Sequence, residues 1–164
     1  MENTHHEGIL RLTIAPAQNI PKSLQKKAEE YMHSLINEMD HVGVMTLELF
    51  DSSDELIVNE IAPRVHNSGH WTIEGAQTSQ FENNIRAITN SPLGATSIKS
   101  SFNAMINIIG MHGQTSKVLE TKNAHLHLYD KEERKGRKLG HITLTSNSME
   151  ELNKSIDSLK EYLP

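Results

Sequence analysis

Two glutamates, Glu48 and Glu60, have the spacing in this sequence that most clearly suggests chemistry. They lie twelve residues apart, within two apolar runs at residues 41–50 and 55–61 that flank a polar stretch around Asp54. This pattern predicts a β-hairpin centred on Asp54, with the two glutamates opposite each other. Like charges directly across a ladder are destabilising. A divalent cation would compensate them, and Mg²⁺ is commonly held by one or two carboxylates together with substrate phosphates.

The same hairpin register predicts the neighbouring pairs. Counting outward from the centre gives these further partners: Leu47 with Ile61, Leu49 with Asn59, and Phe50 with Val58. The alternative interpretation is a solvent-facing hairpin whose two glutamates have no common ligand, because short motifs often match by chance.

The loop after the second glutamate carries groups that bind anions. Residues 59–72 read NEIAPRVHNSGHWT. Arg64 can donate two hydrogen bonds to one anion, and His66 and Asn67 can donate to oxyanions. The pair Ser68-Gly69 allows backbone N–H groups to approach a ligand closely. A loop with only a structural role would need turn residues but not these cationic and imidazole groups, so the composition favours an anion site.

Two further groups of residues could bind ligands. One is a basic turn around Gly136, with five cations in eight residues: Lys131, Arg134, Lys135, Arg137 and Lys138. Such a turn is either solvated or binds phosphate. The other is a set of ten histidines, including His5-His6, His66 with His70, and His125 with His127. A zinc site would need a third ligand at a recognisable spacing, which the sequence does not show.

Composition narrows the class of protein. The chain has 164 residues, enough for one domain or two small ones. It lacks cysteine, which excludes disulfides and thiolate chemistry and favours the cytoplasm. A net charge of −5 without a long run of one sign argues against nucleic acid or a membrane as the main partner. The first residues also lack the hydrophobic segment of a signal peptide.

Periodicity predicts an α+β fold. We expect strands at 8–17, 41–50, 55–61, 104–110, 124–129 and 140–145, and helices at 21–39, at 77–89 and from Ser148 to about Tyr162. The segment Pro92-Leu93-Gly94 ends a helix and precedes a small polar stretch, so it is the best candidate for an internal boundary.

The string NEIAPRVHNSGHWT, followed by SQFENNIRAIT, resembles the carboxyaminoimidazole ribonucleotide synthetases, the ATPase subunits of phosphoribosylaminoimidazole carboxylase in the ATP-grasp superfamily. GILRLTIAPA, HVGVMTLELF and KEERKGRKLGH follow in the family's order, so the resemblance covers essentially the whole chain. It implies the C-terminal half of an ATP-grasp domain, an antiparallel sheet with packed helices, at residues 1–94. A small β-rich C-terminal domain at 95–164 would follow.

The resemblance also implies an activity. These enzymes use ATP to activate bicarbonate as carboxyphosphate and then carboxylate aminoimidazole ribonucleotide in de novo purine biosynthesis. ATP, bicarbonate and aminoimidazole ribonucleotide would be the ligands, with a companion carboxyaminoimidazole ribonucleotide mutase in the pathway and a homodimer as a possible assembly. The family's enzymes are about twice as long, so we expect this chain to be a C-terminal portion that is inactive alone.

Position by position, the resemblance assigns roles to residues of this chain. Glu48 and Glu60 would be the ligands of Mg²⁺ or Mn²⁺. Together with Asn59 they would also contact the nucleotide. Catalytic roles around bicarbonate and carboxyphosphate fall to Arg64, His66 and Asn67. Substrate binding falls to Ser68 and Gly69 and, for the ribonucleotide phosphate, to Lys131, Arg137 and Lys138.

Some positions depart from the pattern of related enzymes. Ala62 stands where many ATP-grasp ligases have asparagine, His6 where arginine is expected, and Asp130 where glycine is usual. The sibling formate-dependent glycinamide ribonucleotide transformylase has a loop closer to His-Asp-Thr-Gly, which favours the carboxylating enzyme. A non-catalytic binding or assembly module that retains the fold, and a histidine-rich metal-binding protein, remain as alternatives.

Overall fold

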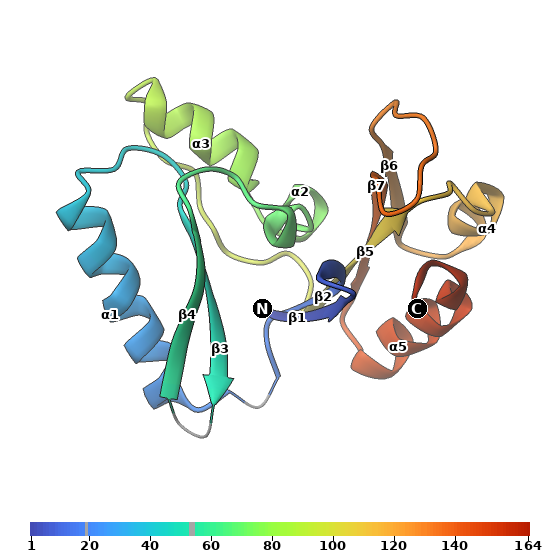
Figure 1. Ribbon diagram of the computed structural model, residues 1–164, viewed down its shortest axis with the longest axis horizontal. Helices are drawn as coiled ribbons and strands as arrows, with labels where there is room; N and C mark the ends of the chain where they lie inside the picture. Colours follow the sequence, from blue (N-terminus) through green and yellow to red (C-terminus); the bar gives the residue numbers. More distant parts are fainter. Residues whose placement is uncertain (19, 53–54) are drawn as a thin grey trace.

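The computed structural model describes residues 1–18, 20–52 and 55–164 and contains two antiparallel sheets (Figure 1). The larger sheet has the strand order β1-β2-β5-β7-β6. Its strands are β1 (Glu2–His6), β2 (Ile9–Ala15), β5 (Phe102–Ile109), β6 (Ala124–Leu128) and β7 (Lys138–Ser146). The smaller sheet is the hairpin of β3 (Thr46–Ser52) and β4 (Glu55–Ala62). The expected α+β class with an antiparallel sheet is confirmed.

Helices pack against both sheets. They are α1 (Lys22–Glu38), α2 (Thr72–Gly75), α3 (Gln80–Ile88), α4 (Thr115–Glu120) and α5 (Met149–Ser158), with short 3-10 helices η1 (Asn67–Gly69) and η2 (Lys160–Tyr162). In Figure 1, α4 and α5 lie on one side of the large sheet, while α1, α3 and the β3–β4 hairpin stand on the other, with α2 between. Over residues 1–18, 20–52 and 55–164, every helix is too short or too polar to cross a bilayer.

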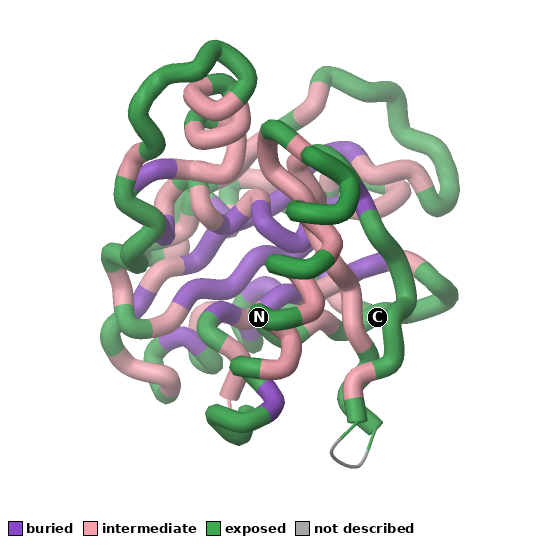
Figure 2. Tube along the Cα trace, turned by 90° about the vertical axis from the view of Figure 1, so that its left-hand side faces the viewer, coloured by how far each residue is buried: buried purple, intermediate pink, exposed green. Residues whose placement is uncertain are grey.

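Strand β5 is the central strand of the large sheet and is buried along most of its length. Figure 2 shows such buried strands in the interior of the chain. Because side chains alternate along a strand, Ala104, Ile106 and Ile108 face the core that α4, α5 and η2 cover. Met105 belongs to a second cluster with Trp71 on the opposite face. The apolar run that predicted this strand therefore reflects burial from two sides.

Local chemistry shifts two of the expected boundaries. The helix expected at 77–89 begins at Gln80, because Ser79 is its N-cap and the hydroxyl of Ser79 accepts a hydrogen bond from the N–H of Glu82. The strand expected at 41–50 begins at Thr46. Before it, Gly43 has a φ of +130°, a conformation outside the strand region that favours glycine.

The hairpin register is correct at the glutamates and wrong nearer the turn. Glu48 pairs with Glu60 and Leu47 with Ile61, as expected. The predicted pairs of Leu49 with Asn59 and Phe50 with Val58 are wrong, since Leu49 pairs with Val58 and Phe50 with Ile57. A bulge next to Glu48 leaves Asn59 as the extra residue of β4. The proposed centre of the turn, Asp54, lies outside the described residues.

The large sheet joins the two ends of the chain. Strand β2 pairs with β5 from Leu12–Ile106 to Ala15–Asn103, so residues before and after the boundary proposed at residue 94 share one sheet. A division into residues 1–94 and 95–164 stays a prediction. Four short elements of the described residues were not expected, namely β1, η1, α2 and α4, because their sequences contain too few apolar residues to show a period.

Candidate functional site

The two glutamates sit side by side at the bulge of the β3–β4 hairpin, with amide groups around them. The side chain of Asn59 donates to Glu48 Oε2 at 3.3 Å, and Asn3 of β1 donates to Glu48 Oε1 at 3.5 Å. Bulges commonly redirect a side chain, and here the extra residue Asn59 supports the carboxylate of Glu48. The bulge thus keeps Glu48 opposite Glu60 while it brings in a hydrogen-bond donor from β4.

A third residue completes a group that fits a divalent cation. One ligand atom from each of Glu48, Glu60 and His66 lies within 4.8 Å of the other two. His66 Nδ1 lies 3.8 Å from Glu48 Oε1. Two carboxylates and an imidazole are a donor set that proteins use for divalent metals. The residues present therefore fit the cation that the sequence predicts here, and they add a nitrogen that the sequence did not assign to it.

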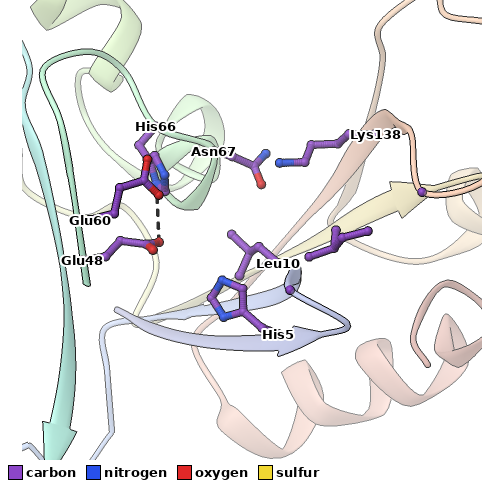
Figure 3. Close-up of a pocket in the computed structure, with 10 residues that line it drawn as sticks. His5, Leu10, Glu48, Glu60, His66, Asn67 and Lys138 are labelled. Carbon is purple, nitrogen blue, oxygen red and sulfur yellow. Dashed lines mark ion pairs between the residues drawn. The ribbon is translucent and has the colours of Figure 1, made fainter. Parts of the chain in front are cut away.

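These side chains line a cavity of about 290 Å³ between the hairpin and the large sheet (Figure 3). The residues around it come from four segments of the chain: His5, Gly8, Ile9, Leu10, Glu48, Glu60, His66, Asn67, Gly136 and Lys138. In Figure 3, Asn67 and Lys138 point toward one another on one side, and the two glutamates with His66 lie on the other. Carboxylates and cationic groups thus face the same space.

The side chain of Gln80 holds the anion loop, which is the loop after Glu60 that carries the anion-binding groups. Its Oε1 accepts from the N–H of His66 at 3.0 Å, and its Nε2 donates to the carbonyl of His66 at 2.7 Å. The same Nε2 lies 2.9 Å from His70 Nδ1. Gly69 makes room for this contact, because a Cβ there would lie 2.7 Å from Gln80 Oε1. One amide group therefore sets the course of the loop at His66.

Asn67 is held from the core by a second amide group. Asn67 Nδ2 donates to Asn107 Oδ1 at 3.0 Å, and Asn107 Nδ2 donates to Asn67 Oδ1 at 2.6 Å. Asn107 is fully buried in β5 and also donates to the carbonyl of Leu10 at 2.9 Å. A buried polar group that is fully hydrogen-bonded gives a fixed orientation, which here orients Asn67 at the edge of the cavity.

The cations expected at the site divide into two sets. Lys138, the first residue of β7, lines the cavity. Burial is the largest cause that lowers its pKa, and the positive charges of Lys131 and Arg64 lower it further. Lys131 lies with its Nζ 5.4 Å from the centre of the Tyr129 ring. Arg64 is largely exposed and lies 3.9 Å from Glu60 Oε1. Among the described residues, Arg64, Lys131 and Arg137 do not line the cavity itself.

The remaining loop residues stand behind the cavity. Ser68 is buried, and its hydroxyl lies 2.8 Å from His66 Nδ1. Gly69 is buried beneath Gln80. The sequence placed both at the substrate, whereas in this structure their visible contacts are to His66 and Gln80.

A cluster of imidazoles packs beneath the loop. His127 stacks on His141 with ring centres 4.4 Å apart, and its Nε2 lies 2.8 Å from Glu74. Burial, with the neighbouring His127 and His70, lowers the pKa of His141 to about 3. Burial, with Lys138 and other nearby groups, lowers the pKa of His70 to about 4. Both rings are therefore neutral near pH 7, and His70 Nδ1 can accept from Gln80.

Sequence reasoning missed two residues that organise the site. Gln80 lies in the string SQFENNIRAIT but was given no role there. Asn107 is a lone amide in the apolar run of β5, which is a signal for a buried hydrogen-bonding role. His5, which the sequence indicated only as one of an adjacent histidine pair, also lines the cavity.

Two family models match the chain. Residues 1–81 match the ATP-grasp domain, and residues 103–155 match the phosphoribosylaminoimidazole carboxylase C-terminal domain. The first match contains both glutamates, His66 and Gln80, while the second contains Asn107 and Lys138. The cavity is therefore built by residues of both matched regions.

Curated proteins and solved structures resemble the chain over nearly its full length. The N5-carboxyaminoimidazole ribonucleotide synthase of Vibrio cholerae is 43% identical over 99% of the chain, and that of Escherichia coli is 44% identical over 99%. The chain spans only 42% and 45% of these two relatives. It thus covers less than half the length of the curated relatives that it matches.

The solved structures agree. The N5-carboxyaminoimidazole ribonucleotide synthetase from Thermus thermophilus superposes with a TM-score of 0.94 at 49% identity, covering 98% of this chain and 44% of that one. A synthase from Aspergillus clavatus, solved with ADP and 5-aminoimidazole ribonucleotide, gives 0.89 at 36% identity, covering 98% of this chain and 45% of that one. Both show that the fold described above is one that occurs within larger enzymes.

Proposed function

The chain belongs to the carboxyaminoimidazole ribonucleotide synthetase family of ATP-grasp proteins, and on that premise we propose that it forms the metal-binding and substrate-binding part of an ATP-dependent carbon–nitrogen ligase. The ligase activates bicarbonate as carboxyphosphate and carboxylates aminoimidazole ribonucleotide in purine biosynthesis. The curated relatives carry the name of this synthase, which favours it over the formate-dependent transformylase and over a non-catalytic module. Because the chain spans under half of these relatives, we expect no turnover from these 164 residues alone.

The observation that carries the proposal is the meeting of opposite charges in one cavity. Glu48 and Glu60 lie with His66 at one side, and Lys138 reaches the same space from β7. Phosphoryl transfer depends mainly on positioning and on charge neutralisation, so carboxylates for a cation and cationic groups for anions are the parts it requires. A solvent-facing hairpin without a ligand would not explain why β1, β7 and the loop converge on the two carboxylates.

The carboxylates and their neighbours bind the nucleotide side of the reaction. Glu48 and Glu60 hold Mg²⁺ or Mn²⁺, and Asn59 orients Glu48 through its hydrogen bond. When bound, the cation neutralises charge on the phosphates of ATP during transfer to bicarbonate. The carboxylates supply the negative charge that would place the cation, and the bulge sets Glu48 opposite Glu60.

The loop positions the small substrates. His66 and Asn67 are oriented by Gln80 and Asn107, so their polar groups are preorganised for an oxyanion such as bicarbonate or carboxyphosphate. Arg64, exposed at the rim, supplies a positive charge to the same anions. Ser68 and Gly69 support the loop from below and leave its backbone close to the ligand.

The basic turn binds the ribonucleotide. Lys138 in the cavity, with Lys131 and Arg137 on the turn beside it, gives a patch of positive charge for the phosphate of aminoimidazole ribonucleotide. The partially desolvated ammonium of Lys138 interacts more strongly with an anion than an exposed one does. We further propose a cytoplasmic protein that can form a homodimer and that passes its product to the companion mutase.

A chimera tests the proposal. The part of the Escherichia coli relative that precedes the matched region is joined to residues 1–164 of this chain, and ADP release is measured with and without each substrate. We expect release that requires both bicarbonate and aminoimidazole ribonucleotide, and that falls at least about a hundredfold in Asn67→Ala. ADP release by a folded chimera that is independent of aminoimidazole ribonucleotide would contradict the proposal.

A further inference from the structure

The imidazole of His66 lies against the carboxylates in a largely enclosed position. Its Nδ1 is the nitrogen nearest Glu48, at 3.8 Å from Oε1. The side chains of His66 and Glu48 are only 11% and 13% exposed, whereas that of Glu60 is 50% exposed. His66 and Glu48 therefore form an enclosed pair, and Glu60 is the more exposed third member.

The hydrogen bonds of His66 indicate which nitrogen carries its proton. The backbone N–H of Ser68 donates to Nδ1 at 3.4 Å, and the hydroxyl of Ser68 lies 2.8 Å from the same atom. A peptide N–H can only donate, so we assign the lone pair to Nδ1 and the proton of the neutral ring to Nε2. Nδ1 lies 3.8 Å from Glu48 Oε1, beyond hydrogen-bond distance, so a cation between the two atoms can use the lone pair of Nδ1 in place of its contact with Ser68.

The spacing of the three side chains suits a divalent cation. Metal–ligand bonds of about 2.1 Å place two ligand atoms no more than about 4.2 Å apart. The three candidate ligand atoms lie within 4.8 Å of one another, so a shift of a few tenths of an ångström by the exposed Glu60 brings all three into range. Asn59 and Asn3 meanwhile hold Glu48 in place.

We propose that His66 Nδ1 is a third metal ligand, so that the site binds divalent ions that accept imidazole, such as Mn²⁺, Co²⁺ and Zn²⁺, without nucleotide phosphates. The proposal rests on the proposed function only in taking Glu48 and Glu60 as metal ligands. Mg²⁺ prefers oxygen ligands and retains its waters, whereas affinity for a nitrogen-containing site rises from Mn²⁺ to Co²⁺.

Pulsed EPR of Mn²⁺ bound to this chain tests the proposal. A coordinated imidazole gives a nitrogen modulation, and growth with ¹⁵N-histidine changes it to the ¹⁵N pattern without any substitution. We expect this modulation in the unaltered chain, its loss in His66→Gln together with weaker Mn²⁺ binding on the order of tenfold, and its retention in the control His125→Gln on the exposed face of β6.

The outcomes separate the two proposals. If Mn²⁺ binds without any histidine nitrogen modulation, and Glu60→Gln abolishes this binding, the role of His66 is overturned. The carboxylate site then stands without it. Modulation that persists in His66→Gln would assign the nitrogen to another histidine and would also overturn it. A lack of Mn²⁺ binding by the folded chain would overturn the proposal, while the chimera assay would still judge the ligase function separately.

Discussion

Gln80 holds both main-chain polar groups of His66 with a single side-chain amide. Its oxygen accepts from the N–H at 3.0 Å, and its nitrogen donates to the carbonyl at 2.7 Å. This arrangement ties the first helical turn of α3 to the loop that faces the cavity. The position of His66 therefore depends on a residue fourteen positions later in the chain.

Replacing Gln80 should loosen the loop more than it affects the rest of the fold. Gln80→Ala removes the acceptor of the His66 N–H and leaves the carbonyl of His66 with the N–H of Gly69 as donor, so we expect the free energy of unfolding to fall by about 2 kcal/mol. Urea unfolding measures this change, with the exposed Gln77→Ala as the matched control. An equal and small effect in both variants would mean that the hydrogen bonds to His66 contribute little.

Gln80→Glu gives a spectroscopic test of the same contact. The carboxylate places a second acceptor beside His70 Nδ1, where the amide had donated at 2.9 Å. Protonation of His70 would relieve this repulsion, so its pKa should rise from about 4, the value that burial sets first. NMR titration of the histidines reports the shift. A pKa for His70 that is the same with glutamine and glutamate would disprove the contact.

Gly69 and Gln80 should behave as one unit. A Cβ at residue 69 would lie 2.7 Å from Gln80 Oε1, so Gly69→Ala must displace the amide. We expect Gly69→Ala to destabilise the chain about as much as Gln80→Ala, and the double variant to cost little more than either. A double-mutant cycle from urea unfolding measures the coupling. Strict additivity of the two effects would show that the residues act independently.

Stability should fall as the pH drops below about 6.5. The pKa of His141 is lowered to about 3 and that of His70 to about 4, chiefly by burial. The unfolded chain then binds protons that the folded chain does not, so this stability is present above the unfolded pKa and is lost toward the folded values. The slope reaches about 1.4 kcal/mol per pH unit for each histidine.

Urea unfolding near pH 7 and near pH 5 checks this expectation. In His141→Gln one of the two histidines no longer contributes, so the free energy of unfolding should differ less between pH 7 and pH 5 than it does in the unaltered chain. If the variant kept the full difference, the buried imidazole of His141 would not be its source.

Asn107 should contribute strongly to the stability of the chain through its hydrogen bonds to Leu10 and Asn67. Asn107→Asp removes the donors to Leu10 and Asn67 and places an acceptor against two others, so we expect a loss of about 3 kcal/mol. The exposed Asn153→Asp is the matched control, for which a change within about 0.5 kcal/mol is expected. Comparable unfolding curves for the two variants would argue against the buried amide pair.

The sequence was informative where apolar spacing was strong and misleading where one residue altered the register. Counting from a centre at Asp54 placed Glu48 opposite Glu60, which the structure confirms. The same count failed for Leu49 and Phe50, since a bulge adds a residue that no periodicity reveals.

The support of the loop was hidden for a different reason. The contact from Gln80 to His66 and that from Asn107 to Asn67 join residues of distant elements. Such contacts are set by packing between elements, and neither residue stands at a spacing that marks its partner. The loop residues themselves were visible because their types suggested anion chemistry, whereas the residues behind them were not.

The central claim is that the carboxylates of the hairpin place the cation on which the ATP step depends. Its most direct test is the dependence of ADP release on Mg²⁺ concentration in the chimera, compared between Glu60→Gln and the control Glu55→Gln at the exposed start of β4. We expect Glu60→Gln to lower the rate at least about a hundredfold across the Mg²⁺ range, and Glu55→Gln to leave it unchanged. Equal turnover and equal Mg²⁺ dependence in the two variants would contradict the account.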